Sequence, residues 1–179
     1  SFDVECKKIT GGELAKLLAS DGVCFYYDKQ SQRFSFSKEE KTSYIADFCE
    51  NKATIKKFLE SDFKKATHGL KDFIKEMKSY DIDVKNVDFD TQIGAYLIEP
   101  SKKSYDLEGL CADYLDIILS DSATDGAQLS LDSMLSGDGE EKIGDYAVAI
   151  LKLKEYEETK TKHDQIDKGL FSTCKHEVA

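Results

Sequence analysis

The chain has 179 residues, of which 40% are apolar and 34% charged, a balance ordinary for one domain with a single core. Its apolar runs are far too short to span a bilayer and no secretory signal opens it, so we expect no membrane association. The net charge of −10 opposes avid nucleic-acid binding by this chain alone. Five cysteines without C-x-x-C spacing are typical of reduced thiols, which predicts a cytoplasmic protein without structural zinc.

The first half of the chain alternates strand and helix signals. We expect strands at residues 6–10, 22–28, 33–37, 63–67 and 86–91, with QSQ closing a hairpin between the second and third. We expect helices at residues 11–20, from about Lys38, at 53–61 and after 68–70, the last with Leu70, Phe73, Ile74 and Met77 on one face.

The second half is dominated by helical patterns. A short helix at 91–98 is ended by Pro100, and Asp106 can cap a helix at 107–119. Residues 120–140 form a polar, glycine-bearing insertion. A long helix starts near Glu140, with an apolar stripe at Ile143, Tyr146, Ile150 and Leu153. Alternating strands and helices predict an α/β fold with a mixed sheet, and we expect residues 1–179 to form one domain.

Two aspartates, Asp88 and Asp90, stand beside an apolar run in VDFDTQIGAYLIEP, and SYDLEGLCADYL follows. These stretches resemble the segment of bacterial DNA polymerase I (family A) in which a strand leads into an F-D-T helix and then a Y-D-L-capped helix. The resemblance implies a 3′–5′ exonuclease, or proofreading, domain with a ribonuclease-H-like (DnaQ-like exonuclease) fold. It also implies that both aspartates are scaffold, as expected for an aspartate that caps a helix.

The chemistry of that family uses two divalent ions, Mg or Mn, that clamp the attacking water and the leaving oxygen of a phosphodiester. Two such hard cations need several carboxylate oxygens in one cleft. The family supplies them from D-x-E on the first strand, an aspartate after N-L-K on a helix, and Y-x-x-x-D on the last long helix. The tyrosine of the last motif orients the attacking water.

The first two motifs are incomplete in this sequence. In VCFYYDKQ the acid positions fall on Tyr27 and Lys29, or Asp28 alone remains if the register slips. In THGLKDFI the acid position falls on Phe73, with Asp72 one residue early. One residue on a helix is about 100°, enough to turn a carboxylate out of a cleft.

The third motif lacks its acid as well. In DYAVAI, Tyr146 is kept and the acid position falls on Ile150, within the apolar stripe of its helix. We therefore expect no catalytic residue and no bound metal. The three histidines lack spaced partners and are interpreted as surface or loop-capping residues: His68, His163 and His176.

Three hypotheses follow for function. The first is a catalytically inactive exonuclease-like domain, a fragment of a larger DNA polymerase I, retained as a structural module in replication and repair. Its partners would be the polymerase region of the same parent chain and, through the full polymerase, DNA. The second is an active metal-dependent exonuclease that uses displaced acids, Asp28, Asp72 and Asp145. The third is a free-standing protein-interaction module.

Overall fold

The computed structural model describes residues 3–119 and 138–167. One mixed sheet of six strands has the order β1-β4-β3-β2-β5-β6. The strands are β1 (Glu5–Lys8), β2 (Val23–Asp28), β3 (Arg33–Glu39), β4 (Thr42–Asp47), β5 (Lys65–Thr67) and β6 (Val87–Asp90). β3 pairs antiparallel with β2 and β4, whereas β1 runs parallel to β4, and β2, β5 and β6 run parallel to one another. The predicted α/β fold with a mixed sheet is confirmed.

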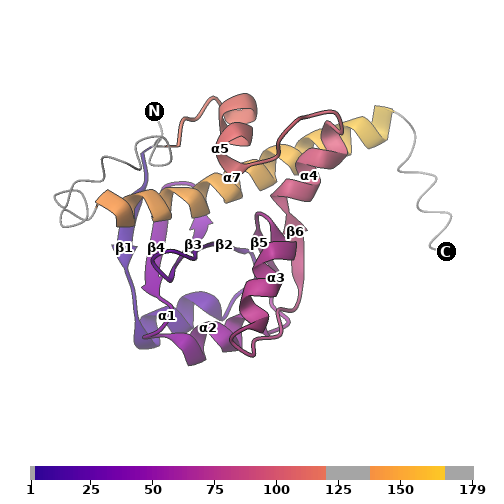
Figure 1. Cartoon of the computed structure of the whole chain (residues 1–179). Coiled ribbons are helices and arrows are strands. Elements are labelled where there is room, and N and C mark those ends of the chain that lie inside the picture. The colour runs from indigo at the N-terminus through magenta and orange to yellow at the C-terminus, as the bar shows by residue number, and fades with distance from the viewer. Residues whose placement is uncertain (1–2, 120–137, 168–179) are drawn as a thin grey trace.

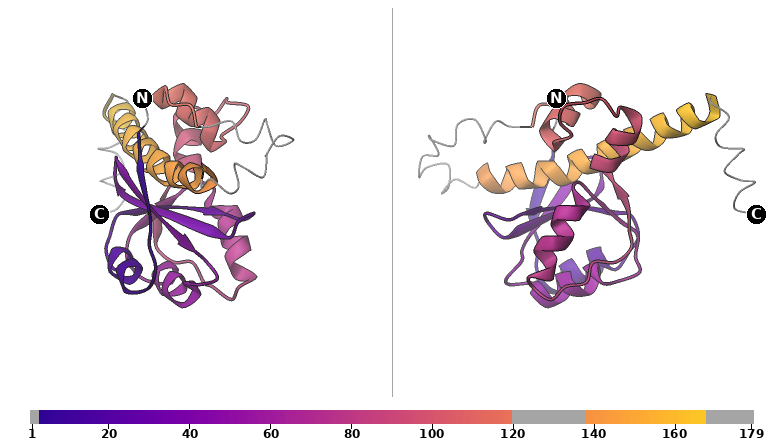
Figure 2. Two further views of the ribbon diagram at one scale, coloured as in Figure 1. Left: turned by 90° about the vertical axis from the view of Figure 1, so that its left-hand side faces the viewer. Right: turned by 45° about the vertical axis from the view of Figure 1, so that its right-hand side comes forward.

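Helices cover both faces of the sheet, as Figures 1 and 2 show. One face carries α1 (Gly11–Leu18), α2 (Lys52–Leu59) and α3 (Leu70–Lys78). The other carries α4 (Thr91–Ile98), α5 (Leu107–Leu110), the π-helical segment η1 (Cys111–Leu115) and the long α7 (Asp138–Asp167). Each face has its own apolar cluster, so the sheet is buried on both sides. No helix within the described ranges combines the length and apolar character needed to cross a bilayer.

Small side chains let α7 lie close to the sheet. β3 alternates Phe34 and Phe36 toward one apolar cluster with buried serines toward α7. The Ser35 hydroxyl donates a hydrogen bond to the Ile143 carbonyl of α7 at 2.7 Å. A Cβ on Gly144 would collide with the Cys6 sulfur of β1, so glycine is needed at this crossing.

Lys65 is a buried lysine at the start of β5. Its Nζ donates hydrogen bonds to the Ser61, Phe63 and Lys85 carbonyls at 2.8, 2.7 and 2.7 Å. Burial lowers the pKa of Lys65. Because all three ammonium hydrogens are used, this side chain ties the loop before β5 to the loop before β6.

The helix predicted from about Lys38 is wrong. β3 continues to Glu39, the chain turns, and β4 returns beside it. Ser43 and Ile45 are buried at alternate positions of β4, which takes its hydrogen bonds from β3 on one side and β1 on the other. The Lys-Glu-Glu-Lys turn resembles a helix start, but strand pairing decides the local structure here.

The helix predicted at 107–119 is shorter than expected. It begins as α5, widens into η1 and ends at Leu115, and the following residue, Asp116, adopts the left-handed conformation (φ 58°). Tyr114 of η1 stacks on Tyr156 of α7 with ring centroids 5.0 Å apart. The other elements lie where they were predicted, within a few residues, and α7 begins at Asp138. The predicted insertion falls mainly on residues outside the described ranges.

Candidate functional site

A cleft of about 420 Å³ opens at the carboxyl ends of β2 and β5, where the chain turns into α3, α4 and α5. We call it the β2 cleft. Ligands of open α/β sheets bind at such strand ends, so this is the expected position for a site. Its lining residues are Tyr26, Tyr27, Lys29, His68, Gly69, Asp72, Phe73, Glu76, Gln92, Asp106, Leu107 and Glu108.

Two tyrosines at the end of β2 face opposite sides of the sheet. The Tyr26 ring packs against Tyr146 of α7, with centroids 4.7 Å apart. The Tyr27 ring packs against Phe34 at 4.6 Å, within the cluster on the opposite face. Burial raises the pKa of Tyr26, and burial with the neighbouring Tyr80 hydroxyl raises that of Tyr27. Both hydroxyls therefore remain protonated near neutral pH.

The two charged residues after these tyrosines are engaged locally. The Asp28 carboxylate accepts hydrogen bonds from the Ser31 backbone N–H, at 3.0 Å, and from the Ser31 hydroxyl. It closes the β2–β3 turn and does not line the β2 cleft. Lys29 pairs with Glu76 of α3 at 3.2 Å, so a cation and an anion of the cleft neutralise one another.

The second motif lies on the first turns of α3. Phe73 is buried, and its ring lies 5.0 Å from that of Phe25, between the helix and the sheet. Asp72 is exposed and also lines the cleft. The residue at the acid position is thus part of the core, and the neighbouring acid faces solvent.

The third motif lies on α7, against the sheet. Ile150 is fully buried in the same apolar cluster as Cys24 of β2 and Leu153. Tyr146 packs on this cluster. Asp145 is partly exposed and does not line the β2 cleft.

Asp90 joins the N-termini of two helices. Its Oδ1 accepts hydrogen bonds from the backbone N–H of Gln92, at 2.9 Å, and of Gly69, at 3.0 Å. Its Oδ2 accepts one from the N–H of Leu70 at 2.9 Å. The carboxylate therefore caps α4 and the start of α3, as its scaffold role predicts. Asp88, two residues before Asp90 on β6, is exposed.

His68 was interpreted as a surface or loop-capping residue, but its side chain is half-buried and lines the β2 cleft. Its Nδ1 is 2.8 Å from the Thr91 hydroxyl, and burial lowers the pKa of the imidazole against the opposing charge of Asp90. The ring is therefore neutral near pH 7. The sequence signal for this placement was its position directly after a short strand, because such residues gather at the carboxyl edge of a parallel sheet. The side chain of His163 and the whole of His176 lie outside the described part of the chain.

Acidic side chains line the cleft, but they do not converge. In addition to Asp72 and the paired Glu76, the cleft is lined by Glu108, which is exposed. Its fourth acid, Asp106, caps α5 by accepting a hydrogen bond from the Gly109 N–H at 3.1 Å. Hydrogen bonds, first from the Ser104 hydroxyl, lower the pKa of Asp106. In the part of the chain that the structure describes, no three His, Cys, Asp or Glu residues are arranged to hold a metal ion. This donor set does not fit a pair of divalent cations.

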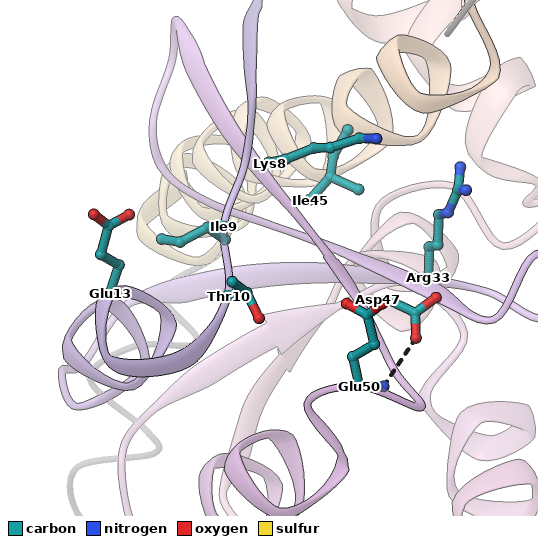
Figure 3. Close-up of a pocket in the computed structure, with 8 residues that line it drawn as sticks. All are labelled: Lys8, Ile9, Thr10, Glu13, Arg33, Ile45, Asp47 and Glu50. Atoms are coloured by element: carbon teal, nitrogen blue, oxygen red, sulfur yellow. Dashed lines mark hydrogen bonds between the residues drawn. The ribbon is translucent and has the colours of Figure 1, made fainter.

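A second hollow, of about 330 Å³, lies at the β1–β4 side of the sheet (Figure 3). Lys8 and Arg33 line it together with three acids, Glu13, Asp47 and Glu50. Asp47 accepts a hydrogen bond from the Glu50 backbone N–H at 2.9 Å, which closes the turn after β4. None of the exonuclease motif positions lies in this hollow.

Comparisons with known proteins bear on the family and the fold of the chain. Residues 24–124 match the family model described as DNA polymerase I, ribonuclease H-like domain. DNA polymerase I of Caldicellulosiruptor bescii is 28% identical over 121 residues, which cover 64% of this chain and 13% of that protein. The chain thus spans about one eighth of the length of this curated relative.

Solved structures share the fold at low sequence identity. The POL domain of Pol1 from M. smegmatis, in complex with DNA primer-template and dNTP, has a TM-score of 0.68 at 18% identity, over 89% of this chain and 28% of that one. Brucella melitensis NrnC with bound Mg²⁺ gives 0.66 at 16%, over 93% and 86%. Escherichia coli RNase D, an exoribonuclease involved in structured RNA processing, gives 0.66 at 14%, over 94% and 48%. The predicted ribonuclease-H-like exonuclease fold is confirmed.

Proposed function

Because this chain belongs to the family of DNA polymerase I ribonuclease H-like domains, we propose that it is a proofreading-type 3′–5′ exonuclease domain that no longer cleaves DNA. In this proposal it serves as a structural module of a cytoplasmic DNA polymerase I in replication and repair. The observation that carries the proposal is the burial of Ile150, at the position of a metal-binding acid, in an apolar cluster. An ionised carboxylate at this place would lack both water and a cation.

The geometry of β2 supports the same conclusion. An acid on β2 that binds the same metal ions as an acid on α7 must face α7. The Tyr26 side chain faces α7, whereas the Tyr27 side chain lies on the opposite face of the sheet. This favours the slipped register, with Tyr26 and Asp28 at the acid positions. Tyr26 fills the space with its ring, and Asp28 is engaged by Ser31. Because the remaining acids are dispersed over the part of the chain that the structure describes, a pair of ions would not find enough oxygen ligands among them.

A nuclease assay tests the proposal. The parent polymerase and this chain are incubated with single-stranded DNA in Mg²⁺ and in Mn²⁺, and we expect no 3′–5′ degradation above background. We also expect calorimetric titration with Mn²⁺ to give no saturable binding in the micromolar to low millimolar range. Degradation that disappears with Asp72→Ala would refute the proposal in favour of an active exonuclease built on displaced acids.

Nucleic-acid binding would reside in the whole polymerase rather than in this module. The M. smegmatis relative was solved with primer-template DNA, whereas this chain carries a net charge of −10. Such a field opposes phosphate binding. We expect only weak single-strand binding by the isolated chain, and a sub-micromolar dissociation constant at physiological salt would contradict this.

A further inference from the structure

The outward face of α4 is unusually apolar for this protein. Charged residues make up 34% of the chain, yet the helix sequence TQIGAYLI contains none. Ile93, Tyr96 and Leu97 are 55%, 53% and 65% exposed, and their spacing of three and four residues places them on one side of the helix. We call these three residues the α4 face. A contiguous exposed apolar patch of this kind is typical of a contact surface.

The α4 face is held rigidly. On the sheet-facing side of α4, Gly94 and Ala95 are buried, and Gly94 lies directly against Glu157 of α7. At the C-terminal end of α4, the Tyr105 ring meets Tyr96 edge-on at 5.8 Å. The Tyr105 hydroxyl donates to the Glu99 carbonyl at 2.7 Å. A partner would therefore meet a preformed surface and lose little entropy in ordering it.

The size and position of the face favour a tethered partner over a free one. A stable interface between separate proteins uses about 20–30 residues a side, far more than the three side chains here. A covalently linked partner, in contrast, acts at an effective concentration in the millimolar range. Figure 1 shows α4 beside the C-terminal half of α7, and the rise from Glu157 to the helix end at Asp167 is about 15 Å.

We propose that the α4 face is the contact surface for the polymerase region of the parent protein, which covers it with apolar side chains of its own. This inference rests on the proposed function, because it requires a polymerase region after α7. It gives the module a specific structural role, since α4 would position the polymerase region against the end of α7. A second copy of this chain would need the larger interface that the face does not offer.

Cysteine footprinting of the parent polymerase tests this surface. Leu97→Cys is compared with Lys41→Cys, a control in the exposed β3–β4 turn, and Ile93→Cys serves as a second probe of the face. Each variant is pulsed with a maleimide in the native and the denatured state, and labelling is quantified by peptide mass spectrometry. We expect the native-state protection of the introduced thiol to be at least tenfold greater in Leu97→Cys and Ile93→Cys than in Lys41→Cys.

The outcomes separate the possibilities. Equal reactivity of Leu97→Cys and Lys41→Cys in the native polymerase would overturn the inference and leave the proposed function intact. Protection that disappears on dilution, together with a dimer in sedimentation, would overturn it in favour of a second copy. A parent gene without a polymerase region would refute the proposed function itself.

Discussion

Replacing Glu157 with glutamine is expected to stabilise this protein at neutral pH. Glu157 is fully buried on α7, and within the described residues neither of its carboxylate oxygens has a hydrogen-bond partner. One of them lies so close to Gly94 that a Cβ there would overlap it. Burial, reinforced by the charge of Asp90, raises the pKa of Glu157 to about 9.

The expected magnitude follows from proton linkage. Between the unfolded-state pKa of 4.5 and the folded-state pKa of about 9, the folded protein holds a proton at Glu157 that the unfolded chain has released. Stability therefore falls by about 1.4 kcal/mol for each pH unit through this window. At pH 7 the accumulated cost is about 3 kcal/mol, and glutamine avoids it because its amide has nearly the same shape and does not ionise.

Urea denaturation from pH 5 to pH 9 measures the effect. The free-energy difference between Glu157→Gln and wild type should be small at pH 5 and widen steadily toward pH 9. Glu158→Gln is the matched control, because Glu158 is partly exposed and pairs with Lys154 at 2.8 Å. A pair of that kind contributes about 0.3–0.5 kcal/mol, so we expect a small loss with little pH dependence.

Two results would refute this reasoning. If the difference between Glu157→Gln and wild type were constant from pH 5 to pH 9, the carboxyl would titrate alike in folded and unfolded protein. If Glu157→Gln lowered stability at pH 8, the ionised carboxylate would have a stabilising partner.

Three further predictions concern buried or capping side chains, and chemical denaturation measures each of them. Ile150→Asp should cost about 3 kcal/mol or more, because it removes a buried apolar side chain and leaves a carboxylate unpaired, and a near-neutral result would mean that the surroundings of residue 150 are solvated. Asp90→Ala should cost about 1–3 kcal/mol through loss of three backbone hydrogen bonds, whereas the exposed Asp88→Ala should change stability by less than about 0.5 kcal/mol. Lys65→Met should cost about 1–3 kcal/mol by leaving three carbonyls without a donor, whereas the exposed Lys64→Met should be close to neutral, and equal losses for the two lysines would contradict the structural role of Lys65.

Local sequence patterns predicted the elements whose signals are periodic and missed the one that depends on distant partners. The apolar face of α3 and the alternation of β3 were visible in the sequence. Apolar residues recur every three to four positions in the helix and at every second position in the strand. β4 was missed because its partners, β1 and β3, supply the hydrogen bonds that make it a strand. The π-helical end of α5 depends on tertiary packing too, because Tyr114 stacks on α7.

The candidate site was predictable in its motifs but not in its orientations. Alignment by residue type placed Tyr27 and Lys29 on the acid positions, with Asp28 alone as the alternative. Only the sheet reveals that Tyr26 is the tyrosine that faces α7. The ion pair between Lys29 and Glu76 likewise joins two residues that are far apart in the sequence, so local sequence patterns could not predict it. By contrast, the capping role of Asp90 was predicted, since an aspartate directly before a helix is a local signal.

If the domain is inactive as proposed, the contact between Tyr26 and Tyr146 limits how a metal site could arise here during evolution. Each ring occupies space beside the other, so a carboxylate placed at either one leaves its partner ring against a void or a charge. The close crossing at Gly144 holds α7 in its register, so the helix cannot slide by one turn to bring a different residue toward β2. Several substitutions would have to appear together before any of them helped. A path to a metal-binding cleft would therefore cross less stable intermediates, and selection for stability favours the present packing.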